Sequence, residues 1–364
     1  MTPHSTFLLL LLSVAAAGAA ADQTPVEDFI ASTGVTAGST EARSLPGWDA
    51  SPTILMRARP GISDTLRDVD ARLIVVSGPA EALEHAAEAD VLVGFCDPDL
   101  VAAAKDLVWV QVYWAGVERC LASEKIRTGR VLLTNLQKMS SSTIGEHAIA
   151  MTLSLTRGLP QFARAMPAGT WDRGMASATG MQSLQGRTML VVGLGGIGKQ
   201  VASRAHALGM RVLATRNSSR EGPDYVDYVG LADELGDLAS EADVIVNALP
   251  LTASTEGLFD RELFARMQEG AYFINVGRGK TVVTDDLLAA LESGRLAGAG
   301  LDVTDPEPLP ADHPLWQRPD VIITPHVAGF GGSRRWHAML VAENIRRYLA
   351  GDVLLNEVDA ARGY

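Results

Sequence analysis

Three segments in the second half of the chain each place one polar residue at the end of a predicted strand or in the loop that follows it. These residues are Arg278 in NVGRG, Glu307 in DVTDPEPLP and His326 in TPHVAG. The carboxyl ends of strands in a doubly wound parallel sheet converge on one crevice, so we expect the three side chains to meet there. Taken singly, Arg278 also fits a turn arginine, Glu307 a surface carboxylate and His326 a cap partner. Their combination favours a catalytic role.

The chemistry that suits this set is hydride transfer to a small 2-keto acid. A guanidinium can hold the substrate carboxylate and polarise the carbonyl, and the oxygen that gains negative charge needs a proton donor. Arg278 supplies the planar cation and His326 supplies the proton. Glu307 orients the imidazole and favours its protonated form.

A glycine-rich turn between two predicted strands indicates a dinucleotide site. The segment VVGLGGIGK, residues 191–199, has the G-x-G-x-x-G spacing, follows a Val-rich strand and opens a helix over 199–208. Glycines permit the tight turn, the close approach of a pyrophosphate and close helix–strand packing, and the helix start holds the anion. The predicted contacts are Gly193, Gly195, Gly196, Ile197 and Gly198. A glycine-rich turn without ligand is the alternative.

The end of the next strand favours NADP over NAD. An Asp or Glu roughly 20 residues after the glycines is typical of sites that bind a free ribose 2′-hydroxyl. This chain reads ATRNSSR there and places Arg216 at that position. A carboxylate would repel a 2′-phosphate, whereas Arg216 can pair with it, helped by Asn217, Ser218 and Arg220. A solvated loop arginine is the alternative interpretation.

Composition excludes several other classes of function. The chain has 364 residues, of which 47% are hydrophobic and 20% are charged, enough for two domains. Its formal net charge of -12 opposes binding to nucleic acid or to anionic membranes. The two cysteines, Cys96 and Cys120, cannot form a disulfide framework or a four-thiolate zinc site, and we interpret each as buried apolar filler. We therefore expect a small-molecule substrate and no metal.

The first residues are typical of a secretory signal peptide. An apolar run over 7–21 ends in small residues, with Ala19 and Ala21 in Ala-x-Ala spacing, which predicts a signal peptide over 1–21 and an exported, periplasmic protein. Only His4 precedes the run as a basic residue, so a misplaced start and a cytoplasmic protein are the alternative. The run is short for a bilayer span, and we expect no stable membrane span.

Short runs rich in Val, Ile and Leu alternate with Ala-rich helical segments on both sides of a long helix, which predicts two parallel sheets covered by helices. In the first half a helix is expected over 81–89, and strands are expected at 54–56, 73–76, 91–95, 108–112 and 131–134. The long helix is expected over 141–159, with Ser142 or Thr143 as its N-cap. A final helix over 334–349 is expected to return to the first domain. Second-half strands are expected at 189–192, 211–214, 244–247, 272–276, 300–303 and 321–324.

These motifs resemble those of the D-isomer-specific 2-hydroxyacid dehydrogenase family, and most of all its NADP-dependent glyoxylate and hydroxypyruvate reductases. The resemblance rests on VVGLGGIGK, NALPLTASTEGLF, NVGRG, LDVTDPEPLP with PLW, and TPHVAG, in family order and spacing. It implies an α/β protein with a doubly wound Rossmann cofactor domain over 140–327. It also implies a homodimer and a smaller flavodoxin-like substrate domain over 22–139, completed by 328–364.

The resemblance also assigns cofactor and substrate contacts. It implies that Asp302 holds the nicotinamide carboxamide and that Leu249, Pro250, Thr255 and Val276 line the cofactor site. The segment WAGVERC is similar to the family segment whose backbone N–H groups bind the substrate carboxylate. Those N–H groups would belong here to Ala115, Gly116 and Val117.

Two other functions stay open at this point. A dinucleotide-sensing interaction protein of the corepressor type shares this fold and can retain the same Arg, Glu and His set. A related phosphite or formate dehydrogenase is the second alternative. Turnover of NADPH with glyoxylate or hydroxypyruvate would separate a reductase from a sensor, because a sensor binds the cofactor without useful catalysis.

Overall fold

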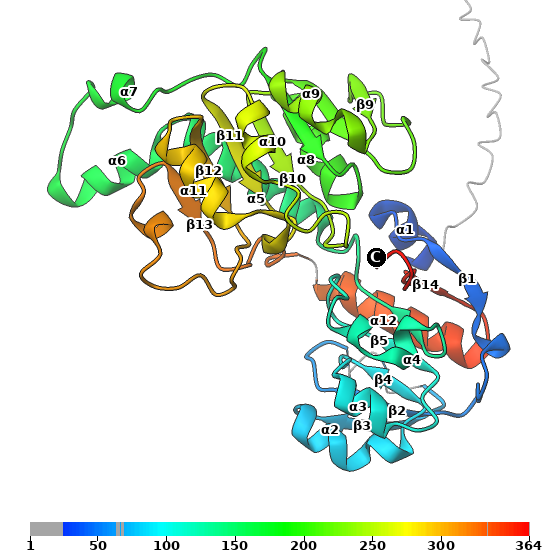
Figure 1. Ribbon diagram of the computed structural model, residues 1–364. Coiled ribbons are helices and arrows are strands. Elements are labelled where there is room, and N and C mark those ends of the chain that lie inside the picture. Colours follow the sequence, from blue (N-terminus) through cyan, green and yellow to red (C-terminus); the bar gives the residue numbers. More distant parts are fainter. Residues whose placement is uncertain (1–24, 63–65, 67–68, 333, 364) are drawn as a thin grey trace, which may run out of the picture.

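The computed structural model describes residues 25–62, 66, 69–332 and 334–363. The predicted signal peptide over 1–21 lies outside these residues. Figure 1 shows two lobes, each with its own sheet and covering helices. The chain crosses between them once before α5 (Ser141–Thr156) and again before α12 (Arg334–Ala350). Within the described residues, no helix has the length and apolar character needed to cross a membrane.

The first lobe is built on a five-stranded parallel sheet in the order β3-β2-β4-β5-β6. Counted from its first strand this is the order 2-1-3-4-5 of flavodoxin-like folds. Helices α2 (Pro79–His85), α3 (Pro98–Ala103) and α4 (Glu124–Arg127) lie between the strands in sequence. The strands are β2 (Thr53–Arg57), β3 (Arg72–Val76), β4 (Val91–Val93), β5 (Trp109–Gln111) and β6 (Leu132–Thr134).

The C-terminal segment returns to the first lobe, as Figure 1 shows for α12 and β14 (Val353–Leu355). Helix α12 buries Leu340, Val341, Ile345 and Tyr348 in the same apolar core as Ile54 and Trp109 of the sheet, and the rings of Trp109 and Tyr348 stack 5.2 Å apart. Strand β14 pairs antiparallel with β1 (Ala37–Glu41), which follows α1 (Pro25–Thr33). The end of the chain therefore belongs to the core of the lobe that its beginning builds.

The second lobe carries a seven-stranded parallel sheet in the order β13-β12-β11-β10-β7-β8-β9. Read from β9, the first six strands have the Rossmann order 3-2-1-4-5-6, so the predicted fold class is confirmed. Its helices include α8 (Gly196–Ala207), α9 (Leu235–Ser240), α10 (Arg261–Arg266) and α11 (Thr284–Glu292). The strands are β7 (Thr188–Val192), β8 (Arg211–Thr215), β9 (Tyr228–Gly230), β10 (Val244–Asn247), β11 (Ala271–Asn275), β12 (Leu296–Leu301) and β13 (Val321–Ile323).

Several local expectations were wrong: α8 begins at Gly196 rather than at residue 199, and α5 ends at Thr156 rather than at residue 159. The N-cap of α5 is Ser140, because Ser142 lies inside the first turn, where its hydroxyl bonds Glu146 and Arg204. Strand β12 begins at Leu296 rather than at residue 300. Its glycines and alanines give a weak apolar signal, yet a side chain at Gly300 would press on Ile274 and Met151 at 3.0 Å. Small residues are needed in this strand because its neighbours approach closely.

Candidate active site

A histidine and a glutamate form a hydrogen-bonded pair at the carboxyl edge of the second sheet. His326 follows β13, and Glu307 lies in the loop that follows β12. The Nδ1 atom of His326 lies 2.7 Å from Oε1 of Glu307, and the side chains are 51% and 44% exposed. When the imidazole is protonated, Nδ1–H donates to the carboxylate and Nε2–H stays available for a substrate oxygen. The structure thus brings together two of the three residues predicted to be catalytic.

A buried carboxylate holds the backbone at His326 in an uncommon conformation. The φ angle of His326 is 54°, in the left-handed region that few residues other than glycine adopt. Oδ1 of Asp302, a residue only 3% exposed, accepts hydrogen bonds from Thr324 Oγ1 at 2.6 Å and from Val327 N at 2.9 Å. Its Oδ2 accepts one from Ala328 N at 3.0 Å. These bonds on both sides of His326 offset a backbone cost of about 1–2 kcal/mol.

The same contacts bear on the predicted role of Asp302 at the nicotinamide. Its carboxylate is engaged by the loop over 324–328, and His147 of α5 reaches the cluster with Nε2 3.0 Å from Thr324 Oγ1. The contact between Asp302 and the carboxamide stays a prediction. What the structure adds is that Asp302 anchors the loop that carries the imidazole.

Arg278 reaches from the second lobe to the segment predicted to bind the substrate carboxylate. It precedes the turn Gly279–Thr281, and its Nε donates to Oε1 of Glu118 at 2.8 Å. Its Nη1 donates to the carbonyl of Gly277 at 2.9 Å. Nη2 lies so close to Gly116 that any side chain at that position would overlap it. The Arg278–Glu118 ion pair therefore joins the two lobes at the candidate site.

The backbone N–H groups of residues 115–117 donate to no acceptor in the part of the chain that the structure describes. The loop itself is fixed through its carbonyls, because Leu136 N donates to Trp114 O at 3.0 Å and Asn135 Nδ2 donates to Ala115 O at 2.7 Å. Successive unpaired N–H groups form a concavity that binds anions. The predicted substrate contacts therefore keep their donors available beside the guanidinium of Arg278.

The loops that carry Arg278 and Glu307 pack against each other. A side chain at Gly279 would overlap the backbone of Thr304, which is three residues before the glutamate. Asn275, at the end of β11, donates to the carbonyl of Arg278 at 3.2 Å and so fixes the backbone there. The guanidinium, the carboxylate and the imidazole thus belong to loops that meet at one edge of the sheet, as predicted from the strand ends.

The glycine-rich turn has the shape that a pyrophosphate needs. Gly193 has a φ of 99°, and a side chain there would meet the carbonyl of Ala248 at 3.1 Å. A side chain at Gly198 would overlap the carbonyl of Gly193, whereas the space beside Gly195 is open for 4 Å. Helix α8 starts at Gly196 without any side-chain cap, so its first N–H groups are unpaired. These residues fit a dinucleotide, and the tight turn at Gly193 and the close packing at Gly198 are as expected, whereas the contacts with the cofactor stay predictions.

Arg216 lies directly after β8, as the sequence predicts for the residue facing the adenosine ribose. Among the described residues its guanidinium donates only to the carbonyl of Glu221, from Nη1 at 2.9 Å, which leaves most of its donors for a phosphate. Asn217 and Ser218 beside it are exposed. Arg220 is bound instead to Glu234, 2.7 Å away, and this pairing helps to lower the pKa of Glu234 to about 2. Arg220 is therefore not free to help with a 2′-phosphate.

The remaining predicted cofactor residues lie along the ends of β10 and β11. A side chain at Gly193 would touch Leu249 at 3.1 Å, so this leucine borders the glycine-rich turn. Thr255 donates from its hydroxyl to the carbonyl of Pro250 at 2.7 Å and thereby shapes the loop after β10. Val276 follows β11 and is buried. Their contacts with the cofactor stay predictions.

Sequence reasoning missed two charged residues at this site. No sequence pattern singles out Glu118, although it lies in the same motif as the substrate loop. Lys138 and Ser141 lie against Gly196, at the start of the pyrophosphate helix. Burial lowers the pKa of Lys138, and the nearby charge of Lys199 lowers it further. No motif marks Lys138, because the fold alone brings this residue of the first crossing to the glycine-rich turn.

The interpretation of both cysteines as separate apolar filler was wrong, because Cys96 and Cys120 form a disulfide with their Cα atoms 5.0 Å apart. Cys96 follows β4 and Cys120 follows the loop after β5, and these strands are neighbours in the sheet. The sheet register therefore brings together residues that are 24 positions apart in sequence. The disulfide ties the substrate loop to the loop after β4.

Reduction of this disulfide should destabilise the protein. A closed loop of this length is expected to contribute about 3 kcal/mol to the free energy of unfolding, because the cross-link restricts the unfolded chain. We expect a reductant to lower the urea midpoint of the wild-type protein. The double variant Cys96→Ser/Cys120→Ser should start at the lower midpoint and show no response to reductant. An equal response of both proteins would mean that the disulfide is not the group being reduced.

Comparison with known proteins agrees with the fold. The family model for the D-isomer specific 2-hydroxyacid dehydrogenase, NAD binding domain, matches residues 149–328. A glyoxylate reductase/hydroxypyruvate reductase from Homo sapiens is 31% identical over 260 residues, which cover 71% of this chain and 79% of the relative. A family protein from Aeromonas salmonicida has a TM-score of 0.75 at 32% identity, over 85% of this chain and all of that one.

A third relative has been solved with its cofactor. The NADPH-dependent glyoxylate/hydroxypyruvate reductase from Sinorhizobium meliloti, in complex with NADP and sulfate, has a TM-score of 0.73 at 28% identity. The alignment covers 86% of this chain and all of that one. The fold and site are those of an NAD(P)-dependent oxidoreductase. The chain belongs to the D-isomer-specific 2-hydroxyacid dehydrogenase family.

Proposed function

We propose that the protein reduces a small 2-keto acid of the glyoxylate or hydroxypyruvate kind to the D-2-hydroxy acid, with NADPH as the hydride donor. The observation that carries this proposal is the 2.7 Å contact between His326 and Glu307 at the edge where Arg278 meets the free N–H groups of residues 115–117. The His326–Glu307 pair can release a proton, and Arg278 with the N–H groups of residues 115–117 can hold a carboxylate.

Arg278, Glu307, His326 and the substrate loop each have a separate role in the proposed reaction. A nicotinamide cofactor held at the glycine-rich turn would supply the hydride for the carbonyl carbon of the substrate. Arg278 and the N–H groups of the substrate loop hold the carboxylate, and the positive charge of Arg278 stabilises the oxygen as it becomes negative. His326 donates its Nε2 proton to that oxygen, and Glu307 keeps the ring oriented through Nδ1. The product leaves as the hydroxy acid, and the imidazole takes up a proton from water.

A panel of 2-keto acids assayed with NADPH and with NADH tests the proposal. We expect consumption of NADPH with glyoxylate or hydroxypyruvate, and weaker activity with NADH. Tight NADPH binding without turnover of any keto acid would favour the dinucleotide-sensing alternative. Oxidation of phosphite or formate with NADP, without turnover of keto acids, would favour a related phosphite or formate dehydrogenase.

Export is a separate proposal that rests on two features. The apolar leader with Ala19 and Ala21 is one, and the Cys96–Cys120 disulfide is the other, because disulfides persist mainly in oxidising compartments. The mass of the mature protein tests it, since cleavage at the predicted site leaves a chain that begins at Asp22. An intact N-terminus on protein from the cytoplasmic fraction would oppose it.

We also propose that the protein is a homodimer. An arm made of α6 (Leu159–Ala165), the turn Met166–Ala168 and α7 (Met175–Ala178) extends from the second lobe in Figure 1. It exposes large apolar side chains, including Trp171, which is 94% exposed. Exposed apolar patches of this kind mark protein–protein contacts. Sedimentation velocity of the purified protein is the measurement that decides between dimer and monomer.

A further inference from the structure

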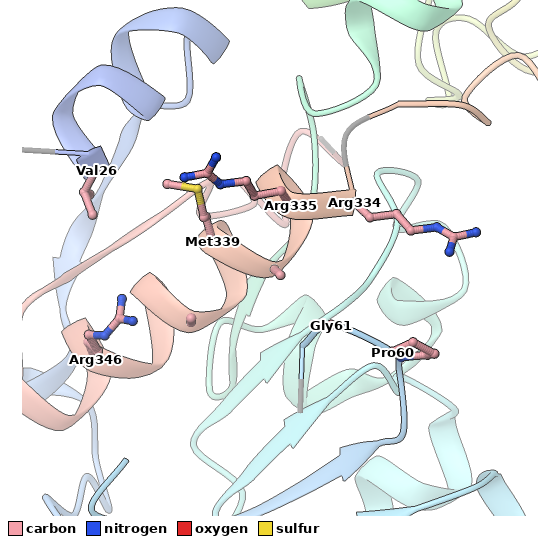
Figure 2. A pocket seen from close by; sticks show the side chains of 9 residues that line it. Val26, Pro60, Gly61, Arg334, Arg335, Met339 and Arg346 are labelled. Carbon is pink, nitrogen blue, oxygen red and sulfur yellow. The ribbon is translucent and has the colours of Figure 1, made fainter. Parts of the chain in front are cut away.

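A cavity of about 230 Å³ lies where the carboxyl end of β2 meets the start of α12, and the proposed chemistry does not use it. Its lining residues are Arg59, Pro60, Ile62, Arg334 and His337. Pro60 and Arg334 also border a larger, mainly apolar cavity between α1 and α12, which Figure 2 shows. Three of the five residues that line the smaller cavity are basic, against three of nine in the larger one.

None of the three basic residues has an acidic partner in the described part of the chain. Arg59 donates from Nη1 to the carbonyl of Tyr113 at 3.1 Å and lies over the ring of the same tyrosine, 5.0 Å from its centre. The guanidinium of Arg334 makes no hydrogen bond or ion pair with the described residues. Both ring nitrogens of His337 are buried without a hydrogen-bond partner. Buried donors of this kind are rarely left unsatisfied, which points to a missing acceptor.

The three groups also repel one another. Burial lowers the pKa of Arg59, and the charges of Arg334 and Arg57 lower it further. Burial, followed by the charge of Arg59, likewise lowers the pKa of His337. Positive groups gathered without a counter-ion are stabilised by a bound anion, which supplies both charge and hydrogen-bond acceptors.

The cavity is close to the loop that faces the substrate carboxylate. Arg59 is bonded to the carbonyl of Tyr113, and the free N–H groups begin two residues later, at Ala115. Three extended residues span at most roughly 10 Å, which sets an upper limit on the separation between Tyr113 and Gly116. A keto acid of four or five carbons with a second carboxylate, or a phosphorylated three-carbon one, carries an anionic group at each end, as two neighbouring anion sites would require.

We propose that the preferred substrate is a dianionic 2-keto acid, whose second anionic group, a carboxylate or a phosphate, is held by Arg59, Arg334 and His337. This inference rests on the proposed keto-acid reduction and narrows its substrate class. The first carboxylate lies at the substrate loop and Arg278, the carbonyl faces His326, and the distal anion enters the basic cavity.

The test compares substrates matched in length but not in charge. With NADPH, kcat/KM is measured for glyoxylate, for 2-oxopentanoate and 2-oxoglutarate, and for oxaloacetate and phosphohydroxypyruvate. We expect at least one dianion to exceed glyoxylate, and 2-oxoglutarate to exceed 2-oxopentanoate, by about 10-fold or more. The comparison of oxaloacetate and 2-oxoglutarate with phosphohydroxypyruvate shows whether the distal group is a carboxylate or a phosphate.

A pair of neighbouring arginines provides a matched test by mutation. Arg334 and Arg335 extend to opposite sides of α12 in Figure 2, and Arg335 borders the larger cavity but not the basic one. We expect Arg334→Gln to lower the ratio of kcat/KM for the dianion to that for glyoxylate by about 10-fold or more. Arg335→Gln should leave this ratio as in wild type. A second readout is calorimetric binding of glutarate and of pentanoate to the NADP complex, where glutarate should bind more tightly and Arg334→Gln should remove the difference.

The outcomes separate this inference from the proposed function. If glyoxylate is reduced while no dianion is preferred, the basic cavity does not select substrate, and the reductase assignment stands. If no keto acid is reduced although NADPH binds, the proposed function itself fails. Equal effects of Arg334→Gln and Arg335→Gln would show a general charge effect and would overturn the specific site.

Discussion

Replacement of His326 by Ala is expected to lower kcat for keto-acid reduction by roughly 10²- to 10⁴-fold, the usual contribution of a positioned proton donor. The affinity for NADPH should change little, because the imidazole is bonded to Glu307 and lies outside the glycine-rich turn. Steady-state kinetics and fluorescence titration with NADPH measure the two quantities. Glu307→Gln should give a smaller loss, since the amide can still accept the Nδ1 hydrogen bond but cannot stabilise the imidazolium.

Control variants keep this prediction specific. His85→Ala removes an exposed histidine from α2 of the first lobe, far in sequence from the site, and should leave kcat unaltered. Thermal unfolding of His326→Ala should show only a small loss of stability, because the side chain is half exposed and alanine, like histidine, places a Cβ at the positive φ. Loss of NADPH binding together with stability would instead indicate a structural histidine and remove the proton-donor role.

Replacement of Arg216 by Asp is expected to reverse the cofactor preference. The 2′-phosphate of NADPH would lose a charge-assisted pair, typically about 1.5–3 kcal/mol, and would face a like charge instead. The ribose hydroxyl of NADH would gain an acceptor. We therefore expect the ratio of kcat/KM for NADPH to that for NADH to fall by about 100-fold or more. Initial rates with both cofactors at a fixed keto-acid concentration provide the measurement.

Arg220→Gln is the matched control for this change. Arg220 lies in the same loop but is bound to Glu234 and to the hydroxyl of Tyr228, so its loss should shift the preference only slightly. Raising the ionic strength should weaken NADPH binding to wild type more than to Arg216→Asp, because screening acts on the charge pair. If the preference ratio in Arg216→Asp equals that of wild type, the 2′-phosphate assignment is incorrect.

The Arg278–Glu118 ion pair gives the candidate site a feature that the sequence did not reveal. Glu118 holds Nε, and the carbonyl of Gly277 holds one hydrogen of Nη1, so the guanidinium is fixed in direction. Nη2 of Arg278 lies against the substrate loop at Gly116. A planar donor set fixed in this way is suited to a carboxylate, because less side-chain entropy is lost when the substrate binds.

The sequence by itself was sufficient for the features that depend on short stretches of chain. Strand periodicity and the strand–turn–helix context of Gly193, Gly195 and Gly198 are local, and they determined the fold class and the pyrophosphate turn. The rule that parallel strand ends converge then placed Arg278, Glu307 and His326 at one edge. The reliable part of the prediction was therefore local backbone preference combined with one rule of sheet geometry.

Only the tertiary structure decided which residues from different segments touch. The register of β4 against β5 created the Cys96–Cys120 disulfide, and the crossing between the lobes brought Lys138 to the glycine-rich turn. The return of α12 placed Arg334 and His337 beside Arg59, a contact across more than two hundred residues. Such pairings form when whole helices and strands pack against each other. The surface buried in that packing belongs to segments far apart in the sequence. A pattern within one segment therefore cannot specify which residues will meet.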